Sequence, residues 1–229
     1  MANSFTVPAP MLRRMLTAVL PHIGLDEELP ALTNVRFEVR GGTLFAEATD
    51  RYTMGVARCG AGGEPGAQQA MLPRKSAKAL RKVLRDAEGR VTITLEPGLM
   101  RAEIDGLTAA EWKTDTRDYS GTSWDDLMHR MVAGTPAAFE DRFGLDAAKL
   151  GRFAIKGPWL EPLLVRVLLP LRRDGATPPG DASPVLLVTR GDWFLGALMP
   201  VRVPVPKDAE ATWNEWVKTT APAEKTEAA

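Results

Sequence analysis

The feature of this sequence that most constrains its fold is a unit that occurs three times. Each copy has a short extended segment, a helix, and three further extended segments, and the helices begin near residues 9, 73 and 145. In the first copy Val35, Phe37 and Val39 alternate with charged residues, and a Gly41-Gly42 pair separates this run from the next, which predicts a hairpin. The sequence therefore predicts three βαβββ units, with the third less regular than the first two.

Composition and length then limit the class of protein and its division into domains. The chain has 229 residues, of which 45% are hydrophobic and 25% charged, and it lacks the apolar run of about 18 residues that a membrane-spanning helix needs. A single cysteine, Cys59, favours a reducing, cytosolic setting. We expect one domain of two units at 1–118, a shortened second domain at 119–206, and a largely disordered extension at 207–229.

The second predicted helix carries strongly segregated charge in a chain whose formal net charge is zero. Residues 73–86 hold six bases and one acid, a net of +5, so the rest of the chain sums to −5. Four of these bases recur at helical spacing on the face opposite Ala77, Leu80 and Leu84. The cationic candidates from the three repeat helices are Arg13, Arg14, Arg74, Lys75, Lys78, Arg81, Lys82, Arg85, Lys149, Arg152 and Lys156.

Two interpretations of these cationic helices stay open. Each helix can simply present an ordinary solvated face, or the equivalent helices of a repeat can present their bases to one polyanion. These helices lack the interleaved aromatic residues that stack on single-stranded bases. If a polyanion binds, the sequence therefore favours contact with the phosphates of duplex DNA, independent of base sequence.

The motifs of common enzymes and metal sites are absent from the sequence. It contains no GxxxxGK[ST], HExxH or GxSxG motif and no Cys–His pairs at metal-ligand spacing. His22 is expected at a helix C-terminus and His129 in a solvated helical turn, and Cys59 is expected to be a small buried residue rather than a nucleophile. The sequence therefore predicts a non-enzymatic protein with no catalytic residues, metal or cofactor.

Four segments carry a resemblance to a known family. They are ALTNVRFEVRGGTLFAEATDRYTMGVAR at 31–58, LPRKSAKALRKVL at 72–84, DYSGTSWDDLM at 118–128 and WFLGALMPVRV at 193–203. Together they resemble the bacterial DNA polymerase III β sliding clamps. The resemblance implies an α+β DNA-clamp fold of repeated βαβββ units, with helices on one face and antiparallel sheets on the other. It also implies a cytoplasmic, nucleoid-associated processivity factor that surrounds duplex DNA in replication or repair.

The same resemblance implies a hydrophobic pocket that receives short peptides from a DNA polymerase, the clamp loader or repair proteins. Methionine suits such a pocket because it is flexible and polarizable, although periodicity alone would place Met54 and Met199 in the core. The residues that match the family's pocket are Leu32, Thr49, Tyr52, Met54, Leu127, Met199, Pro200, Val201 and Arg202.

The chain departs from the family in two respects. It has three units where a full clamp chain has six, so the family's ring contact is not expected in the same form, and a homo-oligomer would need another pair of sheet edges. An alternative function is therefore a binding module or decoy that forms no ring and competes for clamp-binding peptides. The second departure is the extension, in which Trp213, Trp216 and Val217 can pack on the protein's own surface or on a partner.

Overall fold

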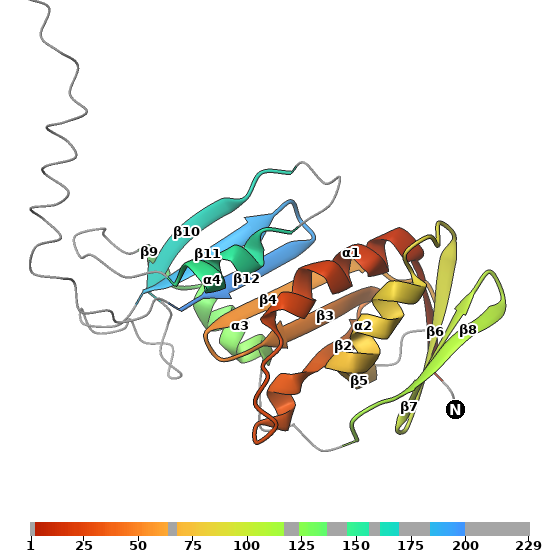
Figure 1. The fold of residues 1–229 in the computed structure, drawn as a ribbon. Coiled ribbons are helices and arrows are strands. Elements are labelled where there is room, and N and C mark those ends of the chain that lie inside the picture. Colours follow the sequence, from red (N-terminus) through yellow and green to blue (C-terminus); the bar gives the residue numbers. More distant parts are fainter. Residues whose placement is uncertain are drawn as a thin grey trace, which may run out of the picture.

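The first two predicted units form the larger part of the structure (Figure 1). The computed structural model describes residues 3–63, 68–116, 124–136, 146–155, 161–169 and 184–199. The first unit contains β1 (Asn3–Pro8), α1 (Ala9–Val19), the 3-10 turns η1 (Leu20–His22) and η2 (Pro30–Thr33), β2 (Asn34–Arg40), β3 (Thr43–Thr49) and β4 (Thr53–Gly60). The second contains β5 (Gln68–Pro73), α2 (Arg74–Val83), β6 (Arg90–Glu96), β7 (Leu99–Ile104) and β8 (Leu107–Lys113).

The third predicted unit is also confirmed, with a much shorter helix. It contains β9 (Thr135–Pro136), α4 (Ala147–Leu150), the 3-10 turn η3 (Gly151–Phe153), β10 (Leu164–Leu169), β11 (Val185–Arg190) and β12 (Phe194–Leu198). Asp146 caps α4, because its side chain accepts hydrogen bonds from the backbone nitrogens of Ala148 (2.9 Å) and Lys149 (3.2 Å). A further helix, α3 (Trp124–Val132), lies near the start of the predicted second domain and before the third unit.

Strands of the three units combine into two antiparallel sheets. A four-stranded sheet has the order β1-β6-β7-β8, and an eight-stranded sheet has the order β5-β2-β3-β4-β12-β11-β10-β9. The first strand of each of the first two units thus pairs with the other unit. The eight-stranded sheet crosses from the second unit through the first into the third, because β4 and β12 pair from Thr53↔Leu198 to Ala57↔Phe194.

The local signals read from the sequence are confirmed by the backbone. Gly41 and Gly42 have φ values of +53° and +73°, as a two-residue hairpin between β2 and β3 requires. The apolar stripe of α1 is buried, and Leu12, Met15 and Leu16 have no exposed surface. Cys59 is buried as predicted, and burial raises the pKa of its thiol to about 11, so it carries no thiolate at neutral pH.

The hydrophobic core is continuous across the boundary expected at residue 118. Phe153, Val188 and Phe194 of the third unit belong to the same buried cluster as α1 and α2. At this junction His22 is completely buried, with its ring centroid 4.8 Å from that of Phe153. Burial, with Arg152 nearby, lowers the pKa of His22 to about 3, so the imidazole is neutral. The third unit therefore completes its core with the first unit's residues.

A second, smaller apolar cluster lies on the other face of the eight-stranded sheet. Met54, Leu187 and Ala197 alternate along their strands with residues of the main core, and Met131 of α3 packs on them. Helices α1 and α3 therefore cover opposite faces of the sheet. Among the described helices, none has the length and apolar character to cross a membrane.

Candidate nucleic-acid interface

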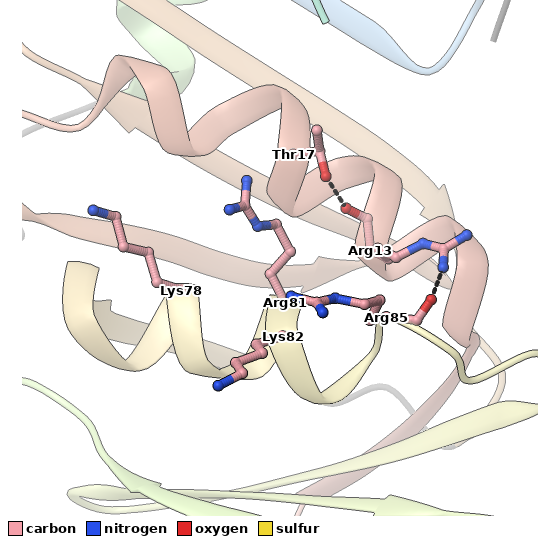
Figure 2. Close-up of a pocket in the computed structure, with 6 residues that line it drawn as sticks. All are labelled: Arg13, Thr17, Lys78, Arg81, Lys82 and Arg85. Carbon is pink, nitrogen blue, oxygen red and sulfur yellow. Dashed lines mark hydrogen bonds between the residues drawn. The ribbon is translucent and has the colours of Figure 1, made fainter. Parts of the chain in front are cut away.

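Helices α1 and α2 lie side by side and carry their cationic residues on adjoining surfaces (Figures 1 and 2). In α2 the residues Ala77, Leu80 and Leu84 are fully buried, as the sequence predicts. Amphipathic packing of this kind leaves the opposite face of the helix to the basic residues. Pro73 precedes the helix in an extended conformation, which sets where the basic face begins.

Five cations from the two helices line one hollow of about 390 Å³ (Figure 2). The Arg13 guanidinium donates a hydrogen bond to the carbonyl oxygen of Arg85, which ties α1 to the end of α2. Thr17 Oγ1 donates to the carbonyl oxygen of Arg13 at 2.8 Å. The residues around the hollow are Arg13, Thr17, Lys78, Arg81, Lys82 and Arg85.

This arrangement favours an anion. Among the described residues no acidic side chain lines the hollow, so the five positive charges there repel one another until an anion occupies it. Guanidinium groups match the geometry of phosphate oxygens, and the lysines add point charge. Thr17 was not among the sequence candidates, although it lies one helical turn after Arg13 and could have been found by that spacing.

Arg74 and Lys75, at the start of α2, lie away from this hollow. They line a second depression beside the 24–33 loop, together with Glu27. The acidic side chain of Glu27 offsets part of their charge there. These two candidates therefore belong to the border of the cationic surface rather than to its centre.

Arg14 differs from the prediction, which placed it away from the apolar face of the first helix. Its side chain is buried, its guanidinium carbon lies 3.8 Å from the centroid of the Trp193 ring, and it forms an ion pair with Glu161. Burial lowers the pKa of the guanidinium, and Glu161 opposes this effect. The Trp193 indole also donates to Glu161, at 2.7 Å. Arg14 thus joins the first unit to the third and is not available to DNA.

The cations predicted in the helix of the third unit, Lys149 of α4 and Arg152 of η3, contact residues of the first unit. Arg152 forms an ion pair with Asp50 and donates to Thr53 Oγ1 at 2.8 Å. Burial pushes the pKa of Asp50 upward, but the bonds from Arg152 and Thr53 outweigh it, so that pKa is lowered. The Lys149 ammonium lies 3.7 Å from the centroid of the Tyr52 ring. Lys156 lies outside the described residues.

The residues predicted to form the peptide pocket differ widely in their exposure to solvent. Tyr52, Leu127 and Met199 are 48%, 37% and 46% exposed, and the Met199 nitrogen donates to the Tyr52 carbonyl oxygen at 2.8 Å. Met54, in contrast, is 3% exposed because it packs in the cluster that contains Met131 of α3.

The other pocket candidates have different settings. Thr49 is buried and donates to the Thr53 carbonyl oxygen at 2.7 Å, within the β3–β4 turn. Leu32 lies in η2, where its carbonyl oxygen accepts a hydrogen bond from the Gly24 nitrogen. Pro200, Val201 and Arg202 lie outside the described residues. Within the described part, three of the predicted pocket residues are exposed apolar side chains, Tyr52, Leu127 and Met199, and we call these three the apolar patch.

Comparison with known proteins confirms the resemblance seen in the sequence. Residues 6–112 match the protein family described as the DNA polymerase III beta subunit, central domain. The fold is similar to that of the DNA polymerase sliding clamp from Bacillus subtilis, with a TM-score of 0.60 and 14% sequence identity over 88% of this chain. This chain spans 64% of the length of that clamp.

Two further solved structures are similar at comparable identity. The DNA polymerase III subunit beta from Pseudomonas aeruginosa matches with a TM-score of 0.52 and 14% identity, over 91% of this chain and 67% of the other. The sliding clamp from Bartonella birtlesii, solved bound to griselimycin, matches with a TM-score of 0.51 and 16% identity, over 88% of this chain and 66% of the other. At these identities the likeness establishes the sliding-clamp fold.

Proposed function

We propose that this relative of the DNA polymerase III β sliding clamps is a non-catalytic factor of DNA replication or repair that binds duplex DNA without sequence specificity. The observation that carries the proposal is the hollow between α1 and α2, whose described lining contains five cations and no acid. A duplex presents phosphates along its whole length, so a surface of this charge gains affinity by releasing counterions.

The chemistry of the hollow favours contact with the backbone over contact with bases. Its lining consists of arginine, lysine and threonine, all of which bond phosphate oxygens, and it contains no aromatic ring for stacking. The cations come from the helical segments of two successive units, so the hollow is formed by the repeated unit and not by one local stretch of sequence. Affinity is then expected to depend on salt much more than on base sequence.

The test is retention of a fluorescent 30-base-pair duplex measured against salt concentration. For the unchanged chain, the logarithm of the association constant should fall linearly with the logarithm of salt concentration. In Arg81→Ala/Lys82→Ala the magnitude of the slope should decrease by about 2, roughly one per phosphate contact removed. A slope that is unchanged by the double substitution would contradict the proposal.

A matched control is available on the other sheet. Arg101 on β7 is an exposed cation paired with Glu111 at 2.6 Å, and it lies outside the hollow. Arg101→Ala should leave both affinity and slope unchanged. Equal losses in Arg101→Ala and in the hollow variant would mean that binding follows total charge rather than this site.

A second function is supported by the apolar patch. Tyr52, Leu127 and Met199 are exposed, and Met54, two residues after Tyr52, is buried in the cluster that contains Met131 of α3. We propose that this patch holds short hydrophobic peptides from a polymerase, a clamp loader or repair proteins, and so tethers them to DNA. Tyr52→Ala and Met199→Ala should each weaken a clamp-binding peptide about tenfold by fluorescence anisotropy. Leu107→Ala, which truncates a side chain that is 76% exposed on β8, is the control.

A further inference from the structure

A separate apolar groove lies on the face of the eight-stranded sheet away from α1. Its volume is about 550 Å³, and its floor includes Val56 of β4, Leu187 of β11 and Leu195 of β12. These residues alternate along their strands with Ala57, Val188 and Phe194 of the main core, so they point to the opposite face. The groove is thus distinct from the cationic hollow of α1 and α2.

One side of this groove is open to solvent and apolar. Leu164 of β10 is 62% exposed and Val132 at the end of α3 is 53% exposed, and both line the groove. Apolar side chains this exposed, gathered over a concave surface, indicate a contact site rather than scattered surface residues. The lining of the groove therefore favours binding of an apolar group.

The charge around the groove limits what that occupant can be. Arg58 and Arg166 are exposed lining residues, and Asp192 is the acid among the lining residues, which gives a net charge of +1. Arg58 Nε also donates to the backbone carbonyl oxygen of Asp192 at 2.7 Å, which fixes the arginine at the rim. A segment that combines large apolar side chains with acidic residues would match both the floor and the rim.

We propose that the groove holds residues 207–217 of the chain's own C-terminal extension. This segment reads KDAEATWNEWV, with one base, three acids and a net charge of −2. Trp213 and Trp216 supply the large apolar groups, and aromatic side chains of this kind commonly anchor contacts in pockets. Glu210 and Glu215 supply charge opposite to that of Arg58 and Arg166.

The chain is long enough to return to the groove. Met199 directly follows β12, whose other end contributes Phe194 and Leu195 to the groove. Trp213 lies fourteen positions after Met199, which corresponds to up to about 46 Å of extended chain, whereas the five residues of β12 span about 17 Å. Because the segment is tethered, its effective concentration is in the millimolar range, so even a weak contact would be occupied.

Cross-linking within the full chain tests this proposal. Thr189→Cys places a thiol at the groove and Asn214→Cys places one between the two tryptophans, and a short bismaleimide joins them when they are close. Thr94→Cys with Asn214→Cys is the matched control, because Thr94 is also a half-buried strand threonine but lies on the four-stranded sheet. Variants with one added cysteine measure any reaction of the buried Cys59.

We expect the Thr189 pair to cross-link within one chain at least tenfold more than the Thr94 pair. Adding Trp213→Ala and Trp216→Ala should reduce the Thr189 yield to that of the control. Equal yields for the two pairs, or a Thr189 yield that survives loss of both tryptophans, would overturn the proposal. Links between two chains that increase with protein concentration would also overturn it, because the occupant would then be a second copy.

Discussion

The first two units and the third unit use the same topology with different amounts of chain. The first two place helices of eleven and ten residues against two sheets. The third orders its strands β9-β10-β11-β12, which parallels β1-β6-β7-β8, but its helix α4 has four residues. A single sheet with so short a helix buries too little apolar surface to be stable alone.

This difference decides what the cations of each helix do. On α1 and α2 the arginines and lysines gather around an open hollow, because Leu12, Leu80 and their neighbours already supply the core. In the third unit Arg152 and Lys149 instead contact the β3–β4 turn. Copies of one sequence pattern therefore use their basic residues differently when one copy depends on another for its stability.

The strongest test of this dependence is a cavity at the shared core. Phe153 is fully buried against His22 and the backbone of Gly196. Phe153→Ala should lower the free energy of unfolding of the whole chain by about 3–5 kcal/mol, in one transition, as measured by urea denaturation followed by circular dichroism. Two separate transitions, with only one of them shifted, would show that the third unit folds independently.

Acid should weaken the same junction. The pKa of His22 is about 3, against an ordinary value of 6.5, so below pH 6.5 the unfolded chain binds a proton that the folded chain does not. The stability that depends on the neutral ring is fully present above pH 6.5 and is lost as the pH falls toward 3. Between pH 6.5 and pH 5 the loss should be about 2 kcal/mol. His22→Leu should unfold with a flatter pH dependence over this interval, and an unchanged dependence would assign the effect to other groups.

Arg81 of α2 and Arg152 of η3 allow a direct comparison of one arginine from the second unit with one from the third. Arg152→Ala should cost about 1–3 kcal/mol of stability, because it leaves the partly buried Asp50 without its ion-pair partner. Arg81→Ala should change the free energy of unfolding by less than about 0.5 kcal/mol, since it relieves repulsion in the hollow. Thermal unfolding of both variants checks this prediction, and a larger loss in Arg81→Ala would reverse the assigned roles.

The smallest expected effect concerns DNA. Arg81→Ala should weaken duplex association severalfold at low salt and lower the salt slope by about 1. Arg152→Ala should leave both unchanged at a temperature where the variant is fully folded. If Arg152→Ala weakened DNA binding as much as Arg81→Ala, the third unit would also contribute to the cationic surface.

Local features of this fold could be predicted from the sequence, whereas contacts between distant segments could not. The alternation of Val35, Phe37 and Val39 and the Gly41-Gly42 pair depend on neighbouring residues, and the structure confirms both predictions. The burial of Arg14 depends on Trp193, which lies 179 positions later in the chain. Helical periodicity contains no information about such a partner.

The candidate site residues also divide into those that local spacing predicts and those whose exposure depends on distant contacts. The basic face of α2 follows from spacing within one helix, so the sequence could predict which residues lie opposite the buried Ala77 and Leu80. Whether Met54 is open or covered depends on the packing of Met131, on a helix that the repeat pattern does not include. The family resemblance could therefore propose candidate pocket residues, but it could not predict which of them are exposed.

The seam between β4 and β12 has a mechanical consequence. Backbone hydrogen bonds cross it in register from Thr53 to Ala57, so bending there would mean breaking the ladder of a single sheet. The angle between the first and third units is consequently fixed by backbone pairing and not by a hinge. If a protein bound to the face that carries α3 and a duplex lay along α1 and α2, the protein would keep a constant orientation toward the duplex.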